Sequence, residues 1–142
     1  MRRLLSLVVI ITGLGAGLWY LRDPPWLAGM ESGFRRWETA ADGTRYRWIA
    51  GHASFFVPAT AASIVIPART TFDDQGDSRV LVSIAIDDRL ADEIELRDDL
   101  WTARTLRLPA PGRRRLRRID IRVDRLRVGM RGVQIGQVVV VR

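Results

Sequence analysis

The sequence predicts an all-β domain, an antiparallel β-sandwich, preceded by one N-terminal transmembrane helix. An uncharged apolar run, Leu4–Leu21, opens the chain, and short segments of alternating polar and apolar residues follow from about residue 44. Turn residues separate those segments, as in sandwiches of short strands. The chain is therefore expected to divide into a membrane anchor (1–22), a linker (23–40) and a β-sandwich domain (41–142).

The apolar run has the length and flanking residues of a membrane helix. A spanning helix needs about 20 mostly apolar residues, and Trp19 and Tyr20 stand where aromatic rings favour the headgroup level. A cleaved signal peptide is the main alternative, but Gly15 and Gly17 give its cleavage pattern only one match. A buried core helix is a third interpretation, and the absence of a polar face disfavours it.

The basic residues before the run predict the orientation. Arg2 and Arg3 keep the amino terminus in the cytoplasm under the positive-inside rule. Residues after about 23 are then extracytoplasmic. We expect a single-pass protein of the bacterial inner (cytoplasmic) membrane, which contacts the membrane through Leu4–Leu21 and does not meet nucleic acid.

Composition restricts the chemistry of the domain. The 142 residues include no Cys and one His, so disulfides, thiolate sites and multi-histidine metal sites are excluded, and no cofactor or metal is predicted. All 23 basic residues are Arg, which binds carboxylate and phosphate in planar, paired geometry. The net charge of +7 suits anionic partners such as lipids or acidic glycans.

Seven or eight short strands are expected. Gly51-His52 is expected to separate the first two, Pro67 to place its strand at an edge or bulge, and Val138–Val141 to form a central strand. Asp87-Asp88 is expected to turn the chain. The expected strands are Thr44–Ala50, Ala53–Val57, Ala62–Arg69, Arg79–Asp87, Glu93–Arg97, Trp101–Leu108, Arg117–Asp124 and Val133–Val141.

Charge is unevenly distributed along these strands. Residues 73–99 hold ten acids, and residues 104–127 hold ten Arg. The favoured interpretation is pairing between the two halves across neighbouring antiparallel strands. The alternative is a basic face that binds a ligand.

Four segments resemble a known type of accessory domain: Gly51–Pro58, Ile84–Arg89, Glu95–Trp101 and Arg131–Gly136. Together they resemble the jelly-roll, carbohydrate-binding-module-like domains attached to bacterial membrane glycosyltransferases of the protein-mannosyltransferase kind. The resemblance spans roughly residues 45–141 and implies a jelly-roll-like sandwich working near glycans or a glycan enzyme. Their transferase activity is not implied, because this chain has one anchor and no catalytic membrane domain.

The candidate ligand-binding residues are aromatic and basic. Sugar sites combine an exposed aromatic face with polar groups, and the Arg-rich run would suit phosphates of lipid or lipopolysaccharide. The alternative interpretation of the Arg-rich run is a solvated loop whose charge protects a strand edge from pairing with other chains. Tyr46 and Trp48 are expected in the core. The candidates are Trp101, Phe56, Arg113, Arg114, Arg115, Arg117 and Arg118.

No catalytic residue is predicted. Adjacent acids such as Asp87-Asp88 and Asp98-Asp99 are typical of turns, and a glycosidase needs two carboxylates facing each other across a sugar. A general base at His52 and a calcium site over Asp73–Asp77 are minor alternatives.

The function expected is therefore that of a non-catalytic interaction module, anchored to the membrane and binding a glycan or assisting envelope glycan enzymes. The alternatives are a module for anionic lipid or lipopolysaccharide surfaces, and a hydrolase that uses an acid pair. A protein partner in the membrane remains open.

Overall fold

The structure, a computed structural model, describes residues 2–70, 79–124 and 132–142. It places the helix α1 (Arg2–Arg22) and the 3-10 helix η1 (Pro25–Gly29) before all the strands. The described strands are β1 (Glu31–Phe34), β2 (Glu38–Thr39), β3 (Arg45–Pro58), β4 (Ser63–Thr70), β5 (Val80–Ile86), β6 (Arg89–Leu96), β7 (Thr102–Arg107), β8 (Leu116–Val123), β9 (Val133–Gly136) and β10 (Val139–Val141).

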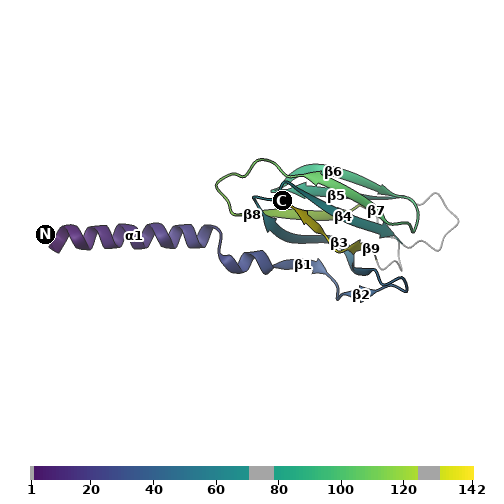
Figure 1. Cartoon of the computed structure of the whole chain (residues 1–142), viewed down its shortest axis with the longest axis horizontal. Helices are drawn as coiled ribbons and strands as arrows, with labels where there is room; N and C mark the ends of the chain where they lie inside the picture. The colour runs from purple at the N-terminus through teal and green to yellow at the C-terminus, as the bar shows by residue number, and fades with distance from the viewer. Residues whose placement is uncertain (1, 71–78, 125–131) are drawn as a thin grey trace.

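The expected N-terminal helix is present as α1, which projects away from the β domain (Figure 1). Its apolar side chains are exposed, among them Ile10, Leu14 and Leu18. Within the part of the chain that the structure describes, which leaves out the side chains of residues 1–5, 7 and 21, no helix is long and apolar enough to span a membrane.

The junction between α1 and the domain is held by specific contacts. The Asp23 carboxylate is buried and accepts the backbone N–H of Arg115 at 3.0 Å. The Arg115 guanidinium lies 5.2 Å from the centre of the Trp19 ring. Pro24-Pro25 then leads directly into η1, so the two parts are joined without a free linker.

The β domain is an antiparallel jelly-roll-like sandwich, as predicted (Figure 1). The described strands pair in the order β10-β4-β9-β3-β8-β5-β6, and β7 pairs with β4. Alternation buries one face of strands such as β4 and β5, and in β5 Val80, Val82, Ile84 and Ile86 all point inward. Burying these apolar faces stabilises the fold by about 25 cal/mol per Å² of apolar surface.

β3 differs from the two strands expected in its place. It runs without a break through Gly51-His52, so the predicted interruption is wrong. The neighbouring strand changes there instead: residues 46–49 pair with β9, and residues 52–58 pair with β8. One long strand thus joins β9 and β8 in the strand order.

Part of the segment expected to be a linker, 23–40, pairs with the sandwich. β1 and β2 are both antiparallel to β3. Gly33 has a φ of +76°, and a Cβ there would lie 1.9 Å from the carbonyl oxygen of His52. Only glycine allows the two backbones to approach this closely.

Two other strand predictions are corrected. Pro67 does not lie on an edge, because β4 pairs with β7 on one side and with β10 and β9 on the other. It pairs with Ala103 of β7, and on the other side of β4 it lies between the residues paired to β10 and those paired to β9. Val139–Val141 is the exposed strand β10 and not part of a central strand, because the preceding strand, β9, ends at Gly136.

Candidate functional site

The outer face of β8 is polar, although its inner face forms part of the core. Strict alternation in β8 points Ile119 and Ile121 inward, both fully buried. Arg118, Asp120 and Arg122 therefore lie on the other face, where Asp120 stands opposite Ser54 of β3 and Ala85 of β5.

Asp120 is the centre of a hydrogen-bonded network on this face. Arg118 Nε donates to Asp120 Oδ2 at 2.8 Å, and His52 Nε2 donates to Asp120 Oδ1 at 2.9 Å. The carboxylate is 3% exposed beneath these two side chains. Burial alone would raise the pKa of Asp120, but the hydrogen bonds from Arg118 and His52 outweigh it and lower the pKa below its ordinary value.

The predicted turn at Asp87-Asp88 is confirmed, and β8 holds it in place. Asp87 and Asp88 form a two-residue hairpin loop with φ values of 49° and 67°. Asp87 Oδ1 accepts the backbone N–H of Arg118 at 3.0 Å, and Asp87 Oδ2 accepts Arg117 Nη1 at 2.6 Å. Asp88 Oδ1 accepts Arg118 Nη2. The turn therefore presents two carboxylates in fixed positions.

Replacing Asp88 with glycine tests whether its carboxylate contributes to the stability of the fold. Glycine favours the left-handed conformation of this position by about 1 kcal/mol, while the Asp88–Arg118 pair is exposed and contributes little. We expect Asp88→Gly to raise the free energy of unfolding by about 0.5 kcal/mol, measured by urea denaturation of the full chain in mild detergent. A loss of stability would show that the Asp88 carboxylate supports the fold.

A pocket of about 370 Å³ opens beside this turn. Leu27 and Phe56 give it an apolar side, while Asp87, Asp88, Arg114 and Arg118 give it a charged side. We call it the Arg118 pocket. An apolar surface facing a few fixed polar groups is the usual composition of a small-ligand site.

Three of the predicted ligand-binding residues meet in the Arg118 pocket: Phe56, Arg114 and Arg118. Arg117 lies behind its wall, because its side chain is only 13% exposed and bonds Asp87 together with the carbonyl oxygens of Pro109 and Ala110. Arg117 is thus a supporting residue.

The other three candidates lie elsewhere. The Arg115 guanidinium is over Trp19, and Arg113 is exposed and does not line the Arg118 pocket. Trp101 lies beside Arg69, whose guanidinium is 4.6 Å from its ring centre, and beside Tyr46 at the opposite end of β3. The aromatic and basic candidates therefore lie in separate places on the domain.

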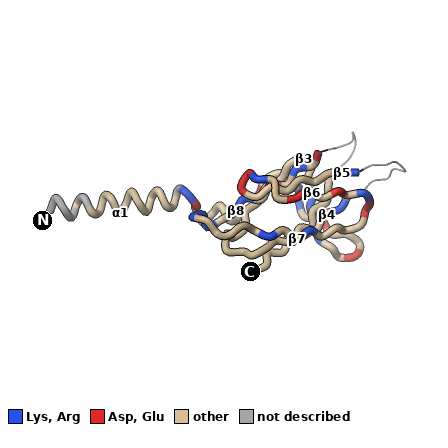
Figure 2. Tube along the Cα trace, turned by 90° about the horizontal axis from the view of Figure 1, so that it is seen from above, with Lys and Arg blue, Asp and Glu red and all other residues tan. Residues whose placement is uncertain are grey.

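The expected pairing between acidic and basic halves is confirmed for several arginines. Arg117 pairs with Asp87, Arg118 with Asp88, and Arg104 with Asp92. Figure 2 shows both charges distributed over the domain, whereas the part of α1 drawn in tan carries no charge.

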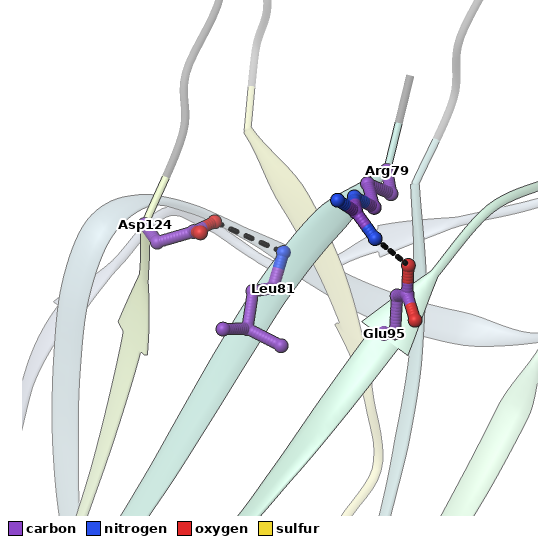
Figure 3. A pocket seen from close by; sticks show the side chains of 4 residues that line it. All are labelled: Arg79, Leu81, Glu95 and Asp124. Carbon is purple, nitrogen blue, oxygen red and sulfur yellow. Dashed lines mark hydrogen bonds and ion pairs between the residues drawn. The ribbon is translucent and has the colours of Figure 1, made fainter. Parts of the chain in front are cut away.

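A second pocket, of about 210 Å³, lies at the other end of β5 (Figure 3). Its polar groups bind one another: Asp124 Oδ1 accepts the backbone N–H of Leu81 at 2.9 Å, and Arg79 pairs with Glu95 at 3.4 Å. We do not assign a ligand to it.

Sequence reasoning missed three residues that line the pocket, Leu27, Asp87 and Asp88, and it missed Asp120, which binds Arg118 of the pocket. Asp87 and Asp88 were predicted only as a turn. Leu27 lies outside the β pattern, and no sequence signal marks it. Asp120 is marked by its position between Arg118 and Arg122 on one strand face. The calcium site over Asp73–Asp77, the minor alternative raised by the sequence, lies outside the described residues. Within those residues no group of three potential metal ligands is present.

The fold is that of jelly-roll sugar-binding domains. The chain is similar to the C-terminal domain of EclA, a sugar-binding protein, with a TM-score of 0.52 and 12% identity over 74% of this chain and 89% of that one. At such identity the similarity establishes the fold alone. No protein-family model and no curated protein sequence matches the chain.

Two further solved structures are similar. One is TmCBM61 in complex with β-1,4-galactotriose, with a TM-score of 0.45 and 17% identity over 87% of this chain and 97% of that one. The other is a family two carbohydrate esterase from Cellvibrio japonicus, with a TM-score of 0.49 and 12% identity. In that case the match covers 79% of this chain and 31% of the esterase.

Proposed function

We propose that this protein is a non-catalytic glycan-binding module and that its ligand occupies the Arg118 pocket. The observation that carries the proposal is the composition of this pocket, which Phe56 lines together with two aspartates and two arginines. A sugar ring stacks its apolar face on an aromatic ring and directs its hydroxyls toward carboxylates and guanidiniums. The sugar-binding function of the similar EclA domain supports the same proposal.

The bonding of the carboxylates favours binding over hydrolysis. A glycosidase needs one acid that keeps its proton near neutral pH and a second free carboxylate. Here Asp87 and Asp88 are each paired with an arginine, and the pKa of Asp120 is lowered instead of raised. Such acids act as hydrogen-bond acceptors for sugar hydroxyls.

A titration tests the proposed binding. The full chain in mild detergent would be titrated calorimetrically with neutral and acidic soluble oligosaccharides, beside the control variant Arg97→Ala. Arg97 is exposed and follows the far end of β6, opposite the Asp87-Asp88 turn. We expect saturable binding of at least one sugar, unchanged in the control. The absence of binding to every sugar would overturn the proposal.

The proposal also includes attachment to a membrane through α1. Val9, Ile11 and Leu18 are each about as exposed as the other apolar side chains described in α1, which extends away from the domain (Figure 1). A contiguous apolar surface of this kind is rare in water. We place the protein in the bacterial inner membrane with its domain outside the cytoplasm, beside envelope glycan enzymes, following Arg2 and Arg3.

Fractionation tests the attachment. We expect the expressed full chain to stay with bacterial membranes after alkaline carbonate washing, because apolar burial and not charge would hold it there. Protease added to intact spheroplasts should then digest the β domain. Release by carbonate, or protection of the domain in intact spheroplasts, would contradict this part of the proposal.

A further inference from the structure

Among the residues that the structure describes, one arginine of the Arg118 pocket has no partner of its own. Asp88 pairs with Arg118, and Asp87 pairs with Arg117. Arg114 lines the same pocket, yet it makes no hydrogen bond or ion pair through its side chain to any residue in the described part of the chain. Its guanidinium is therefore available to a ligand, while the other charges are already matched.

We infer that the ligand of the Arg118 pocket is an anionic sugar, one that carries a phosphate or a carboxylate bound by Arg114. The inference rests on the proposed glycan-binding function and names the class of glycan. A guanidinium binds both anions through two parallel N–H donors, which a neutral hydroxyl cannot match. Phe56 is then left to contact the sugar ring, and Asp87 and Asp88 to accept its hydroxyls.

Two sources could supply such a sugar: the headgroup of a membrane lipid or a soluble glycan. The position of the pocket favours the lipid, because Leu27 lines its wall and follows the last residue of α1, Arg22, by only five residues. Five residues span at most about 18 Å, even when fully extended. With α1 in a membrane, the pocket lies close to the headgroup layer.

The test compares neutral and charged sugars on the full chain in mild detergent. Glucose, galactose, mannose and N-acetylglucosamine would each be titrated against their 6-phosphates, together with glucuronic acid. We expect at least one anionic sugar to bind about tenfold more tightly than its neutral parent, since hydrogen bonds to a charged group are stronger than those between neutral groups. Arg114→Ala should abolish this difference, and the matched variant Arg97→Ala should keep it.

A second arm identifies the source of the sugar. Lipid A, a diphosphorylated glucosamine disaccharide, would be titrated in the same detergent beside phosphatidylglycerol, at low and high salt. Tighter binding of lipid A than of the soluble phosphates, kept at high salt, supports a lipid-borne anionic sugar. Tighter binding of the soluble phosphates supports a soluble one.

Three outcomes contradict the inference. Equal binding of neutral and anionic sugars, unchanged in Arg114→Ala, would overturn it and leave the glycan-binding proposal intact. Equal binding of lipid A and phosphatidylglycerol, erased by salt, would show a surface for anionic lipid in general. The absence of binding to all sugars would overturn the proposed function itself.

Discussion

Replacing Asp120 with Asn is expected to lower the free energy of unfolding by about 2 kcal/mol. The carboxylate is buried and accepts hydrogen bonds from both Arg118 and His52. Asparagine keeps the shape but removes the charge, and its NH₂ group faces one of the two donors. The predicted cost is below that of a fully buried ion pair, because Arg118 and His52 are partly exposed to water.

The effect should depend on pH in a defined direction. Since the pKa of Asp120 is lowered in the folded protein, its contribution to stability is complete above the unfolded pKa of about 3.9. That contribution is lost as the pH falls through the lower folded pKa. The wild-type and Asp120→Asn unfolding curves, recorded by tryptophan fluorescence, should therefore converge below about pH 4.

Asp99→Asn is the matched control. Asp99 is exposed, and no hydrogen bond or ion pair to its side chain is described. The variant should unfold within about 0.5 kcal/mol of wild type. A constant gap between Asp120→Asn and wild type at every pH would show that the loss comes from packing and not from the charge of Asp120.

Phe56→Ala is expected to weaken glycan binding at least tenfold, about 1.4 kcal/mol, in the calorimetric titration. The ring lines the Arg118 pocket from β3, and it is the aromatic surface on which a sugar would stack there. Phe56 is only half buried, so truncation should cost the fold about 1 kcal/mol and leave it folded.

Two further variants separate stacking from general apolar contact. Phe56→Tyr keeps a flat ring and should bind like wild type, whereas Phe56→Leu keeps apolar area without the ring and should bind weakly. Full binding by both Phe56→Leu and Phe56→Ala would place the sugar away from this side of the pocket. Trp101, at the opposite end of β3, would then be the next aromatic residue to test.

Much of the fold follows from local pattern. Alternating polar and apolar residues predicted a strand over Arg117–Asp124, and β8 lies there with Ile119 and Ile121 in the core and Arg118 and Asp120 on the other face. The Asp87-Asp88 turn followed from the preference of aspartate for tight turns. The strand and the turn each depend on residues that are close together in the sequence, so the spacing of those residues was enough to predict them.

The continuity of β3 and the exposure of β10 could not be predicted in the same way. Gly51-His52 resembles an interruption in sequence, but β8 and β1 supply new partners there, so the backbone stays extended. Valine-rich Val139–Val141 resembles a buried strand, but its position at the margin of β4 leaves it exposed. Pairing between distant strands decided both cases.

The candidate site was predicted only in part, because the sequence does not show which distant segments meet. Phe56, Arg114 and Arg118 were all identified by residue type, but type alone could not separate them from Arg115 and Trp101. What joins the three is the end of the sandwich at which β3, the β5–β6 turn and the chain before β8 meet (Figure 1). That meeting point is a property of topology.

The contacts at Asp23 make the connection between α1 and the β domain rigid. Because Arg115 is held by both Asp23 and Trp19, a turn of the helix about its axis carries the whole sandwich with it. Each residue advances an α-helix by about 100° and 1.5 Å. One residue inserted within α1 would therefore swing the mouth of the pocket about a quarter of a turn relative to the start of the helix, so the length of α1 sets the direction in which the pocket faces.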